Sequence, residues 1–384
     1  MPYFDYNATS PLRDCARAAW LKASAESWAN PSAIYPSAQR ARHALERNRM
    51  ALATILGCRA ERIVFTSGAT ECNNTVLHHY ASKGASCAVS AVEHQSVLVP
   101  AKALFGERLI VMPVDESGRL DIAEAERLIH AHRPALVSLM AANSETGVVQ
   151  PVEELSRICR AEHVHMHCDA VQLLGRLPLN HLLDRCDFFS FSAHKIGGPR
   201  GVGVLVIPHK CTERMGLFQG GPQERYQRAG TENLAGAEAL VAAFSEAVME
   251  VAHGRMLRQA AFKASFEARM EQLGARIIGR GAERLPNTSL FIMPRHQGLR
   301  WVTRMATKGF EIATGSACGS EQEQPSHVLS AMGIDAAGAT QVLRVSSGAS
   351  VDEAEWIALA DALAKTQMEL DAEENVDAFG VILP

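Results

Sequence analysis

The sequence lacks the features of a nucleic-acid-binding, membrane or secreted protein. Its 384 residues include 38 lysines and arginines against 42 aspartates and glutamates, so the basic excess typical of nucleic-acid-binding proteins is missing. Charged residues interrupt every apolar run before it reaches the roughly 18 residues of a membrane span. The first eleven residues have no basic stretch before an apolar run, so a secretory signal is not expected. These absences favour a folded cytoplasmic protein that acts on a small molecule.

Cysteine is present, but not in the patterns that mark a metal site or a redox pair. The nine cysteines are scattered and odd in number, without a CxxC pair or a cysteine–histidine cluster at zinc spacing. Reduced thiols in a cytoplasmic protein fit this pattern better than disulfides, and most such thiols are buried as small hydrophobic side chains. A GxGxxG run after the first predicted strand is also missing, which disfavours a nicotinamide-dependent dehydrogenase.

Strand and helix patterns alternate through the N-terminal part of the chain. An amphipathic helix at 37–57 is followed by a short apolar strand at 62–66, a serine–glycine turn and a helix at 69–80. The order then repeats, with strands at 87–92, 109–113, 135–141 and 164–169 and helices at 96–105, 122–132 and 151–163. Such alternation predicts a mostly parallel sheet covered by helices.

The pattern changes after the predicted strand at 164–169. Strands at 187–192 and 203–207 have no long helix between them, which predicts hairpin-like pairing late in the sheet. A long alanine-rich helix at 233–252 follows, and new strands are expected at 289–293, 310–313 and 341–345.

The length also favours two domains, because single hydrophobic cores stop growing at roughly 250 to 300 residues. We expect an α/β fold whose large domain, residues 15–252, has a mostly parallel sheet flanked by helices. The smaller α+β domain would be formed by residues 1–14 and 253–384.

Three polar features follow predicted strands, at the edge where open parallel sheets bind ligands. Ser67-Gly68-Ala69-Thr70 opens a helix and offers backbone N–H groups and a hydroxyl to a phosphate. Asp169 closes one strand and Lys195 follows another, and each charge would be costly to bury without a partner. Alone, these features could be an ordinary helix cap and halves of structural ion pairs. Together they suit pyridoxal phosphate, which needs an amine, an acid for its ring nitrogen and phosphate donors.

Seven motifs, taken in order, resemble those of the cysteine desulfurases. They are Tyr3-Phe4-Asp5-Tyr6-Asn7-Ala8-Thr9, Phe65-Thr66-Ser67-Gly68-Ala69-Thr70-Glu71, Glu93-His94, His167-Cys168-Asp169-Ala170-Val171-Gln172, Ser192-Ala193-His194-Lys195, Arg228-Ala229-Gly230-Thr231 and Gly315-Ser316-Ala317-Cys318. This family belongs to the class V aminotransferase group of fold-type-I pyridoxal-phosphate enzymes. The resemblance therefore implies that fold, pyridoxal phosphate as cofactor and L-cysteine as substrate.

The resemblance implies a role for each polar residue in these motifs. Lys195 would form the imine with the cofactor, His94 would stack on its ring and assist proton transfer, and Asp169 would pair with the ring nitrogen. Gln172 would contact the ring hydroxyl. Because the family is dimeric, the phosphate would be held from two subunits, by Ala69, Thr70, Ser192 and His194 of one and Thr231 of its neighbour.

Substrate recognition is expected from two further segments. Arg344 matches the family position that binds the substrate carboxylate, a task suited to a planar guanidinium, although a surface strand arginine is the alternative. Asn143 is expected at the substrate, and Ser144 stands where the family usually has a second asparagine that contacts cofactor and substrate. Tyr35 and Ala38 also replace a histidine and a glycine that are common in the family.

Cys318 decides which reaction the resemblance implies. It stands among small residues in Gly315-Ser316-Ala317-Cys318-Gly319, which favours a reactive loop thiol over a buried core cysteine. The surrounding residues resemble the long-loop subgroup of the desulfurases. Cys318 would attack the sulfur of L-cysteine, leaving L-alanine and an enzyme persulfide, and the sulfur would pass to an acceptor protein.

Two other functions stay open at this point. A selenocysteine lyase or another class V aminotransferase-type enzyme would use the same cofactor without needing Cys318. A relative that serves in sulfur relay without turnover is disfavoured by the presence of Lys195, His94 and Asp169. The sulfur acceptor is also left open, including an iron–sulfur scaffold protein.

Overall fold

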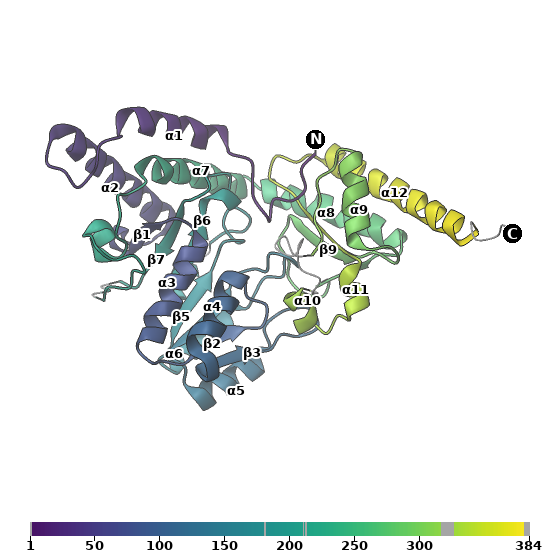
Figure 1. The fold of residues 1–384 in the computed structure, drawn as a ribbon, viewed down its shortest axis with the longest axis horizontal. Coiled ribbons are helices and arrows are strands. Elements are labelled where there is room, and N and C mark those ends of the chain that lie inside the picture. Colours follow the sequence, from purple (N-terminus) through teal and green to yellow (C-terminus); the bar gives the residue numbers. More distant parts are fainter. Residues whose placement is uncertain (1, 180–181, 210, 212, 316–325, 380–384) are drawn as a thin grey trace.

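The computed structural model describes residues 2–179, 182–209, 211, 213–315 and 326–379. Figure 1 shows a larger sheet with its helices beside a smaller sheet with its own helices. Cys318 lies outside the described residues.

Seven strands form the larger sheet, in the order β1-β7-β6-β5-β4-β2-β3. Strands β2 to β6 run parallel, whereas β7 is antiparallel to both β6 and β1. The bounds are β1 (Ile63–Thr66), β2 (Cys87–Ser90), β3 (Leu109–Met112), β4 (Leu136–Met140), β5 (His165–Asp169), β6 (Phe188–Ser192) and β7 (Gly203–Val206). The strands are rich in consecutive apolar residues because helices cover both faces of the sheet.

Two apolar cores cover the two faces of this sheet. Successive residues of β1 point to opposite faces, so Ile63 and Phe65 join one core and Val64 joins the other. The first core takes residues from α2 (Pro36–Leu56), α5 (Ile122–His132), α6 (Val152–Ala161) and α7 (Leu234–Ala252). The second takes residues from α3 (Ala69–Ser82) and α4 (Gln95–Phe105), whose N-terminal ends face the site described below.

The smaller sheet is antiparallel, in the order β10-β9-β8. Its strands are β8 (Arg276–Ile277), β9 (Thr288–Ile292) and β10 (Val342–Ser346). Its core is built around Trp301, Trp356, Phe266 and Phe291. The covering helices are α8 (Arg255–Gln272), α9 (Gly298–Thr307) and α12 (Glu353–Phe379), and two short helices, α10 (His327–Ala331) and α11 (Ala336–Thr340), lie nearby.

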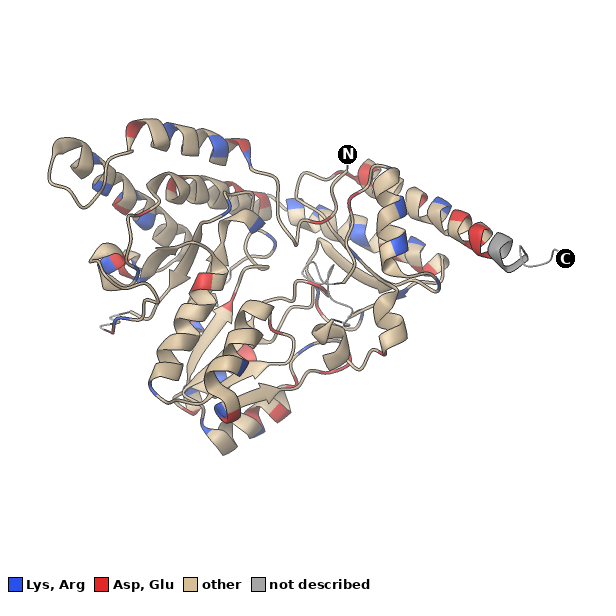
Figure 2. Ribbon diagram, in the orientation of Figure 1, with Lys and Arg blue, Asp and Glu red and all other residues tan. Residues whose placement is uncertain are grey.

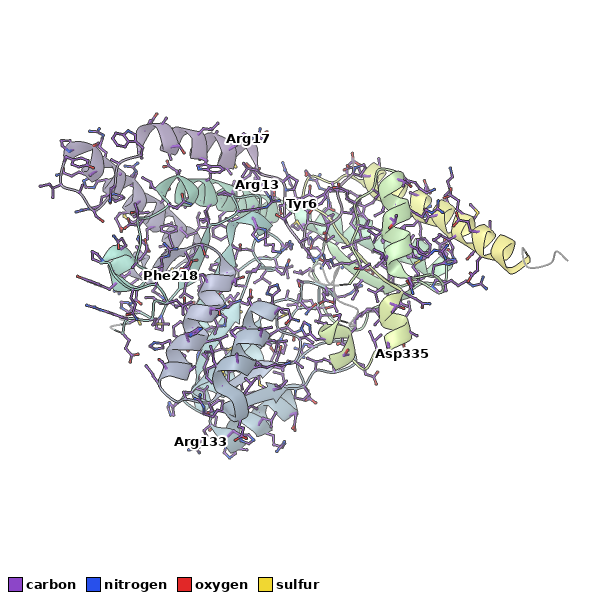
Figure 3. The ribbon with its side chains drawn as sticks, viewed as in Figure 1. Tyr6, Arg13, Arg17, Arg133, Phe218 and Asp335 are labelled. Atoms are coloured by element: carbon purple, nitrogen blue, oxygen red, sulfur yellow. The ribbon has the colours of Figure 1, made fainter. Side chains whose placement is uncertain are left out.

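The N-terminal segment connects the two sheets. Tyr3 and Asp5 form isolated bridges with Glu311 and Ser346 at the smaller sheet. The chain then passes Tyr6 and Arg13, which lie between the two sheets in Figure 3, and enters α1 (Asp14–Glu26) on top of α7. The segment that leaves the smaller sheet therefore crosses the junction between the two sheets.

Most of the expected elements are present with small shifts at their ends. The hairpin-like pairing of the two late strands is confirmed, since β6 and β7 pair antiparallel. The strand expected at 310–313 is wrong: only single bridges from Glu311 and Ala313 occur there. Helix α1 was not expected because Ala16 and Ala23 are its only buried residues. The domain bounds stay a prediction, supported by the separation of the two sheets.

Charges of both signs are spread over the outer helices, as blue and red positions on α1 and α12 show in Figure 2. This distribution agrees with the small net charge of -4. Among the described residues, every helix is too short or too polar to pass through a bilayer.

Candidate active site

A cavity of about 1040 Å³ lies where the carboxyl ends of β4, β5 and β6 meet the smaller sheet. Parallel strands end at the same sheet edge, so residues that follow them in sequence gather there. Of the expected site residues that the structure describes, all but Thr231 line the cavity, namely Ala69, Thr70, His94, Asn143, Ser144, Asp169, Gln172, Ser192, His194, Lys195 and Arg344.

Lys195 ends a short 3-10 helix, Ala193–Lys195, directly after β6. Its Nζ donates to the main-chain oxygens of Asn7 at 2.6 Å and Ala8 at 2.8 Å. Burial, and then the positive charges of Arg176 and Arg344, lower the pKa of Lys195 to about 8. A useful fraction of this amine is therefore neutral, and nucleophilic, near neutral pH.

Asp169 is the last residue of β5 and is buried. Its Oδ2 accepts from Asn73 Nδ2 at 2.9 Å and its Oδ1 from the backbone N–H of Val171 at 3.1 Å. None of the ion pairs found among the described residues includes Asp169. A buried carboxylate held only by neutral donors is suited to pair with a cationic ligand group.

His94 is the N-cap of α4, and its ring is held in one orientation. Its Nδ1 accepts from the backbone N–H of Ser96 at 3.1 Å and lies 2.8 Å from Ser96 Oγ. Because Nδ1 accepts, the proton of the neutral ring is on Nε2. Burial lowers the pKa of His94, against the opposing effect of Asp169. Asn73 Nδ2 also donates to Ser96 Oγ at 2.9 Å and so connects His94 with Asp169.

The start of α3 forms the part of the cavity suited to an anion. Gly68 precedes the helix with φ 154°, and no side chain caps the first turn. The first N–H groups of a helix have no partner within the helix, and the helix dipole favours a negative group there. Gly203 permits this turn to pack closely, because a Cβ at Gly203 would lie 2.5 Å from Gly68 Cα.

His194 lines the same cavity as this turn. Its Nδ1 lies 3.0 Å from Thr9 Oγ1. Burial and the nearby charges of Lys195 and Arg200 lower the pKa of His194 to about 4. His194 is therefore neutral over the working pH range and can act as a hydrogen-bond donor without adding charge.

Gln172 is buried, and only one of the two polar atoms of its side chain has a hydrogen-bond partner among the described residues. Its Nε2 donates to Asn7 O at 3.1 Å, whereas its Oε1 has no hydrogen-bond partner among the described residues. Buried polar atoms are seldom left without a partner. This acceptor is thus available to a ligand hydroxyl.

Arg344 is carried by β10 and is 2% exposed. Its Nη2 donates to Asp5 Oδ1 at 2.7 Å, and its Nη1 lies 3.3 Å from the main-chain oxygens of Ser144 and Gly315. Its Nε is buried without a partner among the described residues. The alternative of a surface strand arginine is therefore wrong, because the side chain is enclosed at the cavity.

The side chain of Asn143 holds the loop that begins at this residue. Asn143 Oδ1 accepts from the backbone N–H groups of Glu145 and Thr146, and its Nδ2 donates to Val92 O. Ser144 contributes its main-chain oxygen, which accepts from Asn7 Nδ2 at 3.0 Å. The direct contacts expected for Asn143 and Ser144 with substrate and cofactor stay predictions.

Thr231 is not at this cavity. It lines a separate small pocket with Phe65, Glu224 and Arg228. That position leaves it available to a neighbouring subunit, as expected, although this role stays a prediction.

Residues without an expected role also belong to the site. Asn73 and Ser96 connect Asp169 with His94, and the N-terminal segment contributes Asp5, Asn7 and Thr9. Asn73 stands in the second helical turn after the phosphate motif, a position that helical spacing could have brought to attention. The N-terminal residues are part of a motif, but only long-range pairing brings them to the cavity.

The chain matches the Aminotransferase class-V family over residues 2–358. It is 36% identical over 340 residues to "Cysteine desulfurase IscS" of Dictyoglomus turgidum, which covers 86% of each chain. A solved NifS-like protein superposes with a TM-score of 0.87 at 31% identity, covering 96% of this chain and 99% of the other. The structure of SspA in complex with cysteine superposes with a TM-score of 0.77 at 27% identity, covering 90% and 98%.

The match extends over the residues that line the cavity as well as over the fold. Class-V aminotransferases and cysteine desulfurases depend on pyridoxal phosphate. The fold, the family match and the curated relatives all agree, and this chain therefore belongs to the cysteine desulfurase group of the class-V aminotransferase family.

Proposed function

We propose that this chain converts L-cysteine to L-alanine and holds the released sulfur as a persulfide on Cys318. The observation that supports this most strongly is the meeting of Lys195, Asp169 and Arg344 at one cavity. An amine, an unpaired carboxylate and a guanidinium there suit a cofactor aldehyde, a cofactor ring nitrogen and an amino-acid carboxylate. The relatives named cysteine desulfurase support L-cysteine as the substrate.

The residues at the cavity fit pyridoxal phosphate. Gln172 Oε1, without a partner among the described residues, can accept from the ring hydroxyl, and Asp169 can pair with the protonated ring nitrogen. The first turn of α3, with Ser192 and His194 beside it, can hold the phosphate. When bound, pyridoxal phosphate supplies an aldehyde that bonds to amines and a ring that accepts the electrons of a carbanion.

Lys195 and His94 are the groups that hold and move protons. The pKa of Lys195, lowered to about 8, lets its amine accept the Cα proton of the substrate near neutral pH. His94 presents a proton on Nε2, because Ser96 occupies its Nδ1. Asn73 keeps both His94 and Asp169 in place through Ser96 Oγ and Asp169 Oδ2.

Arg344 is the group that binds the substrate carboxylate. Its buried Nε–H has no partner in the described part of the chain and can donate to a carboxylate oxygen. With the carboxylate held there, the sulfur of L-cysteine would be transferred to the Cys318 thiolate, which forms an S–S bond as the substrate C–S bond breaks. The electron pair of that C–S bond stays with the substrate carbon, which takes up a proton to give L-alanine as the other product.

The test uses the purified protein with pyridoxal phosphate and L-cysteine. We expect a visible absorption band that changes on adding L-cysteine, equal amounts of L-alanine and transferred sulfur, and a mass gain of one sulfur atom on Cys318. Cys318→Ala should abolish the persulfide and lower turnover by at least roughly 100-fold, since it removes the attacking nucleophile. Cys58→Ala, which removes a half-buried thiol elsewhere, is the matched control and should leave both unchanged.

Full activity of Cys318→Ala would contradict the persulfide step. It would favour the alternative, a selenocysteine lyase or another class-V enzyme in which the thiol is dispensable. A protein that stays colourless after adding pyridoxal phosphate would contradict the assignment as a whole.

We further propose a cytoplasmic homodimer that passes the persulfide sulfur to an acceptor protein, as in iron–sulfur cluster assembly. The names of the IscS relatives support such an acceptor. The position of Thr231 outside the cavity of its own chain supports a site completed by a second subunit.

A further inference from the structure

Asp5 forms the short ion pair of Arg344, yet the reaction as described above gives it no part. The Asp5 Oδ1 to Arg344 Nη2 distance is 2.7 Å, and the two side chains are 20% and 2% exposed. The residues are 339 positions apart in the sequence. Removing two charges from water costs free energy, so an ion pair this enclosed is not explained as an ordinary surface pair.

The backbone, and not the ion pair, sets the position of Asp5. Tyr6 N donates to Ser346 O at 3.1 Å and Ser346 N donates to Phe4 O at 2.8 Å, so this segment lies alongside β10. Phe4 is fully buried and its ring meets that of Trp356 edge-on at 5.1 Å. The carboxylate of Asp5 can therefore be altered while its segment stays in place.

The contacts of Arg344 leave its Nε as the one guanidinium nitrogen without a partner among the described residues. Nη2 donates to Asp5, and Nη1 donates to the main-chain oxygens of Ser144 and Gly315 at 3.3 Å. Glu145, the other buried acid nearby, accepts instead from Ser326 Oγ at 2.6 Å. Asp5 is thus the carboxylate that determines how the Arg344 guanidinium is turned.

We propose that Asp5 is a positioning residue for substrate binding: it holds Arg344 through Nη2 so that the Nε–H stays directed to the substrate carboxylate. This inference rests on the proposed function, in which Arg344 binds that carboxylate. A guanidinium held by a fixed carboxylate loses less freedom when a ligand binds than one that must first be oriented.

Two ligands that differ only in a carboxylate test this role without turnover. L-alanine and ethylamine both present an amine to the loaded enzyme, and their binding can be followed by the change in cofactor absorbance. We expect Asp5→Asn to raise the dissociation constant of L-alanine about tenfold, because a charge-assisted bond that orients Arg344 is lost. Ethylamine binding should change by less than about twofold, since it does not use Arg344.

Turnover of L-cysteine gives the second measurement. Asp5→Asn should raise KM by a similar factor and change kcat by less than about threefold, because binding and not proton transfer is affected. Asp361→Asn, which removes an aspartate–arginine pair with Arg269 on the surface, is the matched control and should change neither.

The Arg344→Met variant separates failure of this inference from failure of the proposed function. If Arg344→Met does not weaken L-alanine more than ethylamine, the assignment of Arg344 as the carboxylate-binding group is overturned. If it does, but Asp5→Asn leaves L-alanine unchanged or binds it more tightly, Asp5 instead competes with the substrate and the inference alone is overturned. Equal weakening of both ligands by Asp5→Asn would also overturn it, as general damage to the site.

Discussion

At the scale of single residues, three buried charges of this site have no ion-pair partner in the described part of the chain. Lys195 rests on two main-chain oxygens, Asp169 on neutral donors, and Arg176 on the main-chain oxygens of Gln172 and Tyr6. Each arrangement keeps a charged group in place without neutralising it. Such groups perturb one another's protonation, which is how a site obtains a reactive amine near neutral pH.

Arg176 should control the pH at which Lys195 reacts. Burial is the largest cause that lowers the pKa of Lys195 to about 8, and the positive charge of Arg176 is the second largest. The neutral amine fraction grows as pH rises through that value, so removing a nearby positive charge should move the transition to higher pH. Arg176→Met is expected to shift the midpoint of pyridoxal-phosphate uptake, followed by absorbance, upward by roughly one pH unit.

Arg176→Lys is the control for this prediction because it keeps the charge, and it should leave the midpoint within about a third of a pH unit. A midpoint that moves equally in both variants would mean that lost packing, not lost charge, is responsible.

At the scale of elements, the site depends on how closely the start of α3 packs against β7. Gly203 of β7 pairs with Thr66 and lies under Gly68, the residue before α3. The turn that opens α3 can take its place only because Gly203 has no side chain. The phosphate end of the cavity is thus determined by contact between two backbones.

Gly203→Ala should displace this turn. The added Cβ would lie 2.5 Å from Gly68 Cα and 2.7 Å from Phe191 O, and backbone atoms cannot move aside cheaply. We expect a loss of about 1–3 kcal/mol in the free energy of unfolding and a fall of about tenfold in pyridoxal-phosphate affinity. Thermal unfolding and an absorbance titration would measure the two effects.

Gly281→Ala provides the comparison, since a Cβ there meets no atom within 4 Å. It should change neither quantity. Unaltered cofactor affinity in Gly203→Ala would show that the phosphate does not bind at this turn.

At the scale of the whole molecule, large apolar side chains are exposed at the end formed by α1 and α2. Trp28 is 73% exposed and Ile34 is 88% exposed, with Leu21 and Met50 also exposed nearby. Figure 1 shows α1 and α2 at the side of the larger sheet away from the smaller one. Exposed apolar residues gathered in one region often mark a protein interface, and a second copy of this chain is the partner we propose.

Trp28→Asp should weaken that dimer. A charge on an apolar interface is expected to raise the dimer dissociation constant by at least roughly tenfold, as analytical ultracentrifugation would measure. Leu299→Asp changes a similarly exposed residue on α9 and should leave the dimer intact. If Thr231 serves the partner's cofactor, the Trp28→Asp monomer should also bind pyridoxal phosphate more weakly; unchanged affinity would remove Thr231 from the site.

Local patterns in the sequence were sufficient to predict the alternation of strands and helices and the residues that follow each strand. Because parallel strands end at one edge, these patterns also predicted that Lys195, Asp169 and the turn at Gly68 would meet. They wrongly predicted a strand at 310–313, where only single bridges occur. A short apolar run forms a ladder only where a partner strand pairs along its length.

The roles of Asp5, Asn7 and Asn73 became visible only in the folded chain. Asp5 meets Arg344 across 339 positions, and Asn73 meets Asp169 across 96, through pairings that no local periodicity encodes. Side-chain type and spacing determine which groups reach the edge of a sheet. Contacts between distant segments determine which buried donor is left without a partner and which charge orients its neighbour. These two properties therefore depend on the tertiary structure alone.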